Sequence, residues 1–133
     1  MSDAPVKVGL VGCGNISSIY LKNDARFDPF QIVAVSDLMP ERAQQRADAF
    51  RLTAMSVEEL LADPAIEVVL NLTVPMAHAS VDTQAMATGK SVYSEKPLAV
   101  DLADGRRLVE LAAAQGVRLG CAPDTFLGAG LQT

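Results

Sequence analysis

Short apolar runs alternate along this chain with longer stretches in which apolar residues recur at helical spacing. Runs at residues 6–11, 30–36, 66–73 and 91–94 are rich in β-branched residues and are bounded by glycine, proline or polar residues. Each of these runs predicts a buried strand rather than one face of a helix. A further run at residues 117–121 predicts a fifth strand.

The stretches between the strands carry helix start and stop signals. Pro40 suits the first position of a helix, and Ser56 with Glu59 has the spacing of a capping box. Gly89 and Gly116 suit left-handed helix ends. The expected helices cover residues 15–26, residues 40–50, a short segment from Ser56 to near Pro64, residues 78–88, and a segment capped by Asp101 that runs through Gln115.

Apolar strands that alternate with helices predict an α/β fold with a doubly wound parallel sheet of the Rossmann type, covered by helices on both faces. A length of 133 residues suits one domain. We assign this domain to residues 1–122, and residues 123–133 to the start of a connection to a missing second domain. Phe126 and Leu127 lie between glycines with no following element to bury them. The alternative is a C-terminal segment that folds back on the sheet.

Composition narrows the function classes. Sixteen acidic residues against eleven basic ones give a net charge of −5, and the basic residues are scattered, which argues against nucleic acid as a partner. No apolar run reaches the roughly 20 residues of a membrane span, and the first residues do not resemble a secretory signal. We therefore expect a cytoplasmic protein. Cys13 and Cys121 lack CxxC spacing and a histidine cluster, so we expect no metal site and two small buried residues.

A glycine motif follows the first strand directly. Gly12, Gly14 and Ser17 have the spacing G-x-G-x-x-G/A, with serine as the small third residue. In that pattern the first glycine permits a tight turn, the second lets the backbone approach a pyrophosphate, and the third lets the helix pack on the strand. Strand-turn-helix placement favours dinucleotide binding; the alternative is a tight turn without a ligand.

Asp37 stands at the end of the second strand, where an acidic side chain accepts hydrogen bonds from the adenosine ribose. Its charge would repel the 2′-phosphate of NADP, and the following Leu38 and Met39 offer no cation to offset that repulsion. The predicted cofactor is therefore NAD, with NADP less favoured. The alternative is an acid that only interacts with the start of the helix at Pro40.

Thr73, Pro75 and His78 follow the third strong strand. Pro75 biases Val74 to extended geometry, so we expect the chain to leave the sheet at its carboxyl edge, where such sheets bind ligands. His78, the only histidine, would then lie near the cofactor. A structural hydrogen-bonding role is the open alternative.

Glu95, Lys96 and Pro97 follow the next strand. A lysine held at that edge could bind a substrate hydroxyl and assist its proton transfer during hydride transfer. From spacing alone, a solvated Glu-Lys pair is an equally good interpretation.

Together, the segments GLVGCGNIS, TVPMAH and SEKPLA, with Asp37 between the first two, resemble the N-terminal domain of the Gfo/Idh/MocA oxidoreductase family over essentially the whole chain. EKP is the most specific element. The resemblance implies that Lys96 lies beside the nicotinamide and the substrate. It implies cofactor contacts by Gly12, Gly14, Asn15, Ile16, Asp37, Leu38, Thr73, Pro75, His78, Glu95, Lys96 and Pro97.

The resemblance also implies hydride transfer to or from a hydroxyl or carbonyl of a sugar, inositol or related polyol. In the family, a C-terminal α+β domain supplies an acid and a histidine for proton transfer, and its sheet usually forms a homo-oligomer. We therefore expect these 133 residues to bind NAD but to turn over substrate poorly or not at all. Asp124 falls near the active site of the family, but its role is undefined.

Two other classes compete with this interpretation. A methyltransferase would need a glycine where this chain has Ile16, and the EKP segment would be unexplained. An NAD-binding regulatory protein of the same fold would lack catalysis, and Lys96 argues against it because a sensor needs no proton-handling lysine.

Overall fold

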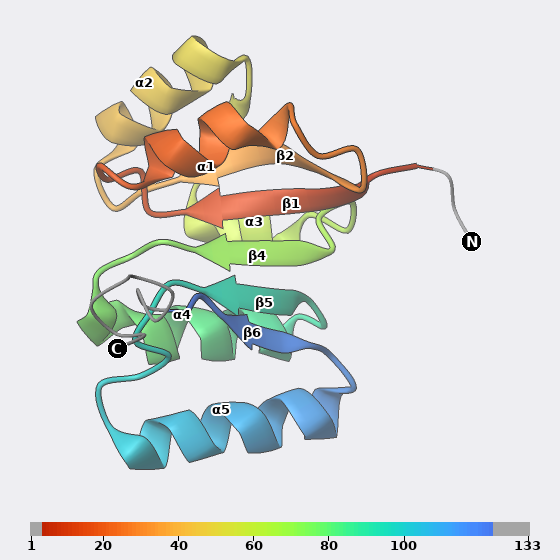
Figure 1. Cartoon of the computed structure of the whole chain (residues 1–133), viewed down its shortest axis with the longest axis vertical. Helices are drawn as coiled ribbons and strands as arrows, with labels where there is room; N and C mark the ends of the chain where they lie inside the picture. The colour runs from red at the N-terminus through yellow and green to blue at the C-terminus, as the bar shows by residue number, and fades with distance from the viewer. Residues whose placement is uncertain (1–3, 124–133) are drawn as a thin grey trace, which may run out of the picture.

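The computed structural model describes residues 4–123, whose strands form one six-stranded parallel sheet in the order β3-β2-β1-β4-β5-β6 (Figure 1). The order reverses between β1 and β4, as in a doubly wound Rossmann sheet. The fold class is therefore confirmed. The strands are β1 (Val6–Val11), β2 (Phe30–Ser36), β3 (Thr53–Ala54), β4 (Val68–Asn71), β5 (Ser91–Ser94) and β6 (Leu119–Cys121).

Helices pack on both faces of the sheet, and alternate strand residues feed two separate cores. Leu10 and Leu70 pack with α1 and α2 on one face, whereas Val11 and Val69 pack with α3, α4 and α5 on the other. Strands buried on both sides are therefore apolar throughout, as the sequence pattern requires. The helices are α1 (Ser17–Asp24), α2 (Pro40–Phe50), α3 (Val57–Ala62), α4 (Pro75–Ala87) and α5 (Leu102–Gln115).

Several element boundaries differ from the sequence prediction. The helix expected at residues 15–26 begins only at Ser17, because Asn15 and Ile16 form a turn. The strand expected at residues 66–73 is shorter, because β4 extends only where it pairs with β1 and β5. The helix expected from residue 78 already begins at Pro75, which takes the first helical position.

Two further predictions concern the burial of the cysteines and the C-terminal segment. Cys13 is buried as predicted, but Cys121 is exposed, because it lies on the edge strand β6 and has a neighbouring strand on one side only. Of the predicted connecting segment at residues 123–133, the structure describes only residue 123. Asp124, Phe126 and Leu127 therefore lie outside the described part of the chain.

The capping box at the start of α3 is present. Ser56 Oγ accepts from the Glu59 backbone N–H at 3.1 Å, and the Glu59 carboxylate accepts from the Ser56 backbone N–H at 2.8 Å. We predict that Ser56→Ala lowers the free energy of unfolding by about 1 kcal/mol, because it leaves a helix amide without its partner. Urea unfolding measures this change. Ser80→Ala, at an exposed position of α4, is the control and should change stability by less than about 0.5 kcal/mol; equal effects would contradict the capping role.

Candidate functional site

The predicted site residues gather at the carboxyl edge of the sheet. Because all strands are parallel, the loops after β1, β2, β4 and β5 leave the sheet at this same edge (Figure 1). The strand order reverses between β1 and β4, and open α/β sheets have their ligand-binding crevice at such a point, outside the carboxyl ends of the strands.

Gly12 occupies a backbone position that only glycine fits. Its φ is +101°, and a Cβ there would lie 2.6 Å from the carbonyl carbon and oxygen of Leu72. Its N–H donates to the Ser36 carbonyl at 2.8 Å. The loop after β1 therefore packs directly on the backbone that follows β4.

Gly14 and the start of α1 suit an anionic group. A Cβ on Gly14 would meet nothing within 4 Å, so the space above the loop is open. Ser17 is fully buried, and its hydroxyl donates to the Gly14 carbonyl at 2.6 Å, which holds the turn closed. Within residues 4–123, no side chain caps α1, whose first amide groups follow the exposed Asn15 and Ile16. Open space beside an uncapped helix start fits a pyrophosphate.

Asp37 is half-buried and is oriented by two backbone amides. Its Oδ2 accepts from the Cys13 N–H at 2.8 Å, and its Oδ1 accepts from the Met39 N–H at 2.8 Å. Each carboxylate oxygen can accept more than one hydrogen bond, so acceptor capacity remains for ribose hydroxyls. Leu38 beside it is 96% exposed. The geometry joins the acid at the end of β2 to the glycine loop.

Arg46 also lies beside the glycine loop. The sequence reasoning missed it, because only the residues directly after Asp37 were considered as possible cations. Its guanidinium donates to the Gly14 carbonyl at 3.3 Å from α2. Burial and the charge of Asp37 raise the pKa of the Cys13 thiol to about 11, while the Arg46 charge opposes this rise. Cys13 is therefore a protonated thiol and not a nucleophile.

His78 connects the two loops on the other side of the crevice. It is fully buried on α4, with Nδ1 2.6 Å from the Pro97 carbonyl oxygen and Nε2 2.9 Å from the Thr73 carbonyl oxygen. Carbonyl oxygens only accept, and a neutral imidazole carries a single N–H, so a neutral ring donates to one of these two carbonyls. Both nitrogens face protein backbone, and the predicted contact of His78 with the cofactor stays a prediction. Pro75 is exposed at the start of α4.

A buried polar trio joins the ends of β4 and β5. Asp82 accepts from Asn71 Nδ2 at 2.7 Å and from Ser94 Oγ at 2.6 Å, and all three residues are fully buried. Burial raises the pKa of the Asp82 carboxyl, whereas the hydrogen bonds from Asn71 and Ser94 oppose the rise. The sequence reasoning missed this trio. Asn71, a polar residue in an apolar strand, was the available signal.

The loop after β5 holds Lys96 at the exposed edge. Glu95 is half-buried, and its Oε1 accepts from the Tyr20 hydroxyl at 2.6 Å while its Oε2 accepts from the Lys96 N–H at 3.1 Å. Burial and the hydrogen bond to the Glu95 carboxylate raise the pKa of the Tyr20 hydroxyl. Lys96 and Pro97 are exposed and are joined by a cis peptide bond. Glu95 therefore ties this loop to α1, and the Lys96 Nζ forms no hydrogen bond or ion pair with residues 4–123.

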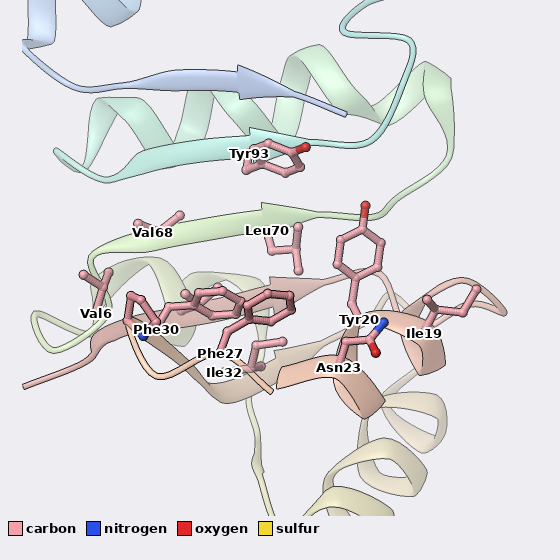
Figure 2. A pocket seen from close by; sticks show the side chains of 12 residues that line it. Val6, Ile19, Tyr20, Asn23, Phe27, Phe30, Ile32, Val68, Leu70 and Tyr93 are labelled. Atoms are coloured by element: carbon pink, nitrogen blue, oxygen red, sulfur yellow. The ribbon is translucent and has the colours of Figure 1, made fainter. Parts of the chain in front are cut away.

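An apolar hollow of about 670 Å³ lies elsewhere, on the face of the sheet that carries α1 (Figure 2). Phe27 and Phe30 stack in it with ring centroids 5.6 Å apart, and Tyr20 and Tyr93 line its other end. None of the predicted cofactor contacts lines this hollow. Its apolar walls do not suit a diphosphate, so we place the site at the strand ends.

Residues 4–123 show neither a metal-ion cluster nor a membrane-spanning helix. This part of the chain brings together no group of three or more His, Cys, Asp or Glu that would hold a metal ion. None of its helices has the length and hydrophobicity needed to cross a bilayer.

A protein-family comparison matches residues 6–122 to the Gfo/Idh/MocA model, described as an oxidoreductase family with an NAD-binding Rossmann fold. Inositol 2-dehydrogenase of Salmonella typhimurium is 36% identical over 118 residues, which cover 86% of this chain and 35% of that protein. The chain thus spans about a third of the length of this relative.

Two solved structures resemble the fold closely. The WlbA dehydrogenase of Bordetella pertussis, in complex with NADH and UDP-GlcNAcA, has a TM-score of 0.88 and 30% identity over 96% of this chain and 40% of its own. Biliverdin reductase of Synechocystis, in complex with biliverdin and NADP+, has a TM-score of 0.88 and 30% identity over 96% of this chain and 41% of its own. Nicotinamide dinucleotides are thus bound by proteins with this fold.

Proposed function

Because this chain belongs to the Gfo/Idh/MocA family of oxidoreductases with an NAD-binding Rossmann fold, we propose that it forms the dinucleotide-binding domain of a sugar, inositol or polyol dehydrogenase. The observation that carries the proposal is the arrangement at one sheet edge of an open glycine loop, an oriented acid at Asp37 and an exposed Lys96. The similarity to inositol 2-dehydrogenase supports a polyol substrate.

Each group has a defined task in this proposal. The backbone N–H groups of Gly14, Asn15 and Ile16 bind the pyrophosphate at the start of α1, which the tight turn at Gly12 makes possible, and Asp37 accepts from the ribose hydroxyls. Bound nicotinamide supplies the site that accepts or donates the hydride. Thr73 and Pro75, in and after the loop that follows β4, contact the cofactor from the other side of the strand-order reversal.

Lys96 is the proposed catalytic residue. Its ammonium donates a hydrogen bond to the substrate oxygen and assists the transfer of the hydroxyl proton to a basic group of the second domain as the carbonyl forms, or the return of that proton in the reverse direction. Glu95 and Pro97 fix the loop that presents it. A second domain would supply most of the substrate pocket, so the chain by itself should bind NAD and turn over substrate poorly.

The substrate class is tested by a screen of the full-length protein with NAD and a panel of inositols, sugars and other polyols. We expect a substrate-dependent rise in the absorbance of reduced nicotinamide with at least one of them. Dinucleotide binding without turnover of any polyol would overturn the dehydrogenase assignment and favour an NAD-binding regulator. The similarity to inositol 2-dehydrogenase argues against that alternative.

Asp37 should set the preference for NAD. We predict that Asp37→Ala lowers the ratio of NADH to NADPH affinity about tenfold, because the repulsion of the 2′-phosphate is removed while Arg46 stays nearby. Titration of each dinucleotide measures the ratio. Asp48→Ala, which removes the same charge at an exposed position of α2, is the control; an unaltered ratio in Asp37→Ala would discard the ribose role.

Assembly and cellular compartment stay predictions. The family resemblance implies a homo-oligomer formed by the second domain, and native mass spectrometry of the full-length protein would measure its assembly. The cytoplasmic location rests on the sequence alone.

A further inference from the structure

Two buried polar side chains of α4 contact both loops on the Lys96 side of the crevice. His78 and Asp82 lie one helical turn apart, and each is fully buried. Residues spaced by one turn share a helix face. Here that face is directed at the ends of β4 and β5, where the loops that contain Thr73 and Lys96 begin.

Asp82 holds the two strand ends together through a single carboxylate. It accepts from Asn71, the last residue of β4, and from Ser94, the last residue of β5. Asn71 in turn accepts, through Oδ1, from the Thr73 N–H at 3.1 Å and from the Thr73 hydroxyl at 2.7 Å. The hydrogen bonds therefore run from Ser94, directly before Glu95, through Asp82 and Asn71 to Thr73 in the loop after β4.

His78 links the same two loops farther out. Its ring lies between the carbonyl oxygens of Thr73 and Pro97, at 2.9 and 2.6 Å. Because Pro97 directly follows Lys96, the ring constrains the residue next to the proposed catalytic lysine. With no exposed surface and both nitrogens facing backbone, His78 has no free group to offer a ligand.

Packing alone does not account for Asp82. Burial raises the pKa of its carboxyl, which reflects the cost of taking the charged form out of water. An apolar side chain of similar size would fill this space without that cost. An apolar residue would lose the hydrogen bonds with Asn71 and Ser94, and these bonds are what Asp82 contributes at this position.

We propose that His78 and Asp82 are positioning residues for the nicotinamide side of the site, acting through the loops after β4 and β5. For His78 this proposal replaces the direct cofactor contact that the family resemblance implies. The proposal rests on the proposed function, which puts the nicotinamide beside Lys96. The glycine loop and Asp37 lie across the strand-order reversal from these loops. The glycine loop meets the loop after β4 only where Gly12 packs on the backbone of Leu72 and Thr73. Binding of the adenosine half should therefore depend on the pair less than binding of the nicotinamide half does.

The test compares two probes on the same chain: ADP-ribose, which lacks the nicotinamide, and NADH. Asp82→Leu keeps the size of the side chain but removes both acceptors, and we expect it to weaken NADH binding about tenfold while ADP-ribose affinity stays within about twofold. Asp82→Asn is the conservative control. Its amide can accept from Asn71 and donate to Ser94, so NADH affinity should remain near that of the wild type.

Ser94→Ala covers the case in which Asp82→Leu fails to fold, because it removes one hydroxyl only. We expect it to weaken NADH binding about threefold, again with little effect on ADP-ribose. Equal losses for both probes, no loss with Ser94→Ala and Asp82→Leu, or a loss with Asp82→Asn as large as with Asp82→Leu would overturn the positioning role. Failure of the wild-type chain to bind either probe would instead overturn the proposed function.

Discussion

Replacing Lys96 with alanine should lower the turnover of the full-length enzyme about 100-fold or more, the size of effect that a lost acid or base group has. The lysine is exposed at the strand edge, and its backbone N–H is held by Glu95, so the substitution removes the ammonium group and leaves the loop intact. NADH affinity should stay within about twofold, because the proposed dinucleotide contacts lie mostly on the other loops.

Steady-state kinetics with the best polyol substrate and a titration of NADH measure both effects of Lys96→Ala. Lys22→Ala is the matched control, since Lys22 is an exposed lysine in the last turn of α1. Turnover in Lys96→Ala equal to that in the control would remove Lys96 from the mechanism.

Replacing Gly12 with alanine should have the largest effect on the dinucleotide site. The added Cβ would lie 2.6 Å from the carbonyl atoms of Leu72 and 2.7 Å from the Thr73 nitrogen, all of which are backbone atoms that cannot turn aside. The φ of +101° adds strain for any residue with a Cβ. We expect a loss of about 3 kcal/mol in the free energy of unfolding and NADH binding at least about 100-fold weaker.

Gly89→Ala separates the two causes of this effect. Gly89 also has a positive φ, +80°, but a Cβ there would meet nothing within 4 Å. It should therefore cost only about 1 kcal/mol and leave NADH binding unchanged. Urea unfolding and NADH titration of both variants make the comparison. Equal stability of the two variants, with normal NADH binding by Gly12→Ala, would contradict the close approach of the loops after β1 and β4.

The fold could be predicted because its strongest signals are local. Strands buried on both faces must be apolar throughout, and this separates them from the helices in the sequence. The predicted bounds of β1, β2 and β5 match the structure. β3 was missed because a two-residue strand, Thr53–Ala54, carries no periodic pattern. β4 was predicted too long, because the length of a strand depends on its neighbours and not on its own residues.

The candidate site was predictable only in part, for a similar reason. Gly12, Gly14 and Asp37 follow strands directly, so their place at the sheet edge follows from strand order alone. Arg46 reaches the glycine loop from a neighbouring helix, and no local pattern indicates that contact.

The buried polar network shows the same limit. Asp82 meets Asn71 and Ser94 only because α4 packs beneath two adjacent strands. The spacing of His78 and Asp82 on one helix face was a usable signal, but it does not reveal what that face contacts. Packing between elements far apart in the sequence supplies that information, and the sequence pattern does not contain it.

The most direct measurement is a calorimetric titration of this 133-residue chain with NADH and, separately, with NADPH. We predict that NADH binds to one site and that NADPH binds more weakly, because Asp37 accepts from a ribose hydroxyl and repels a 2′-phosphate. No binding of either dinucleotide, or tighter binding of NADPH, would contradict the site built from Gly12, Gly14 and Asp37.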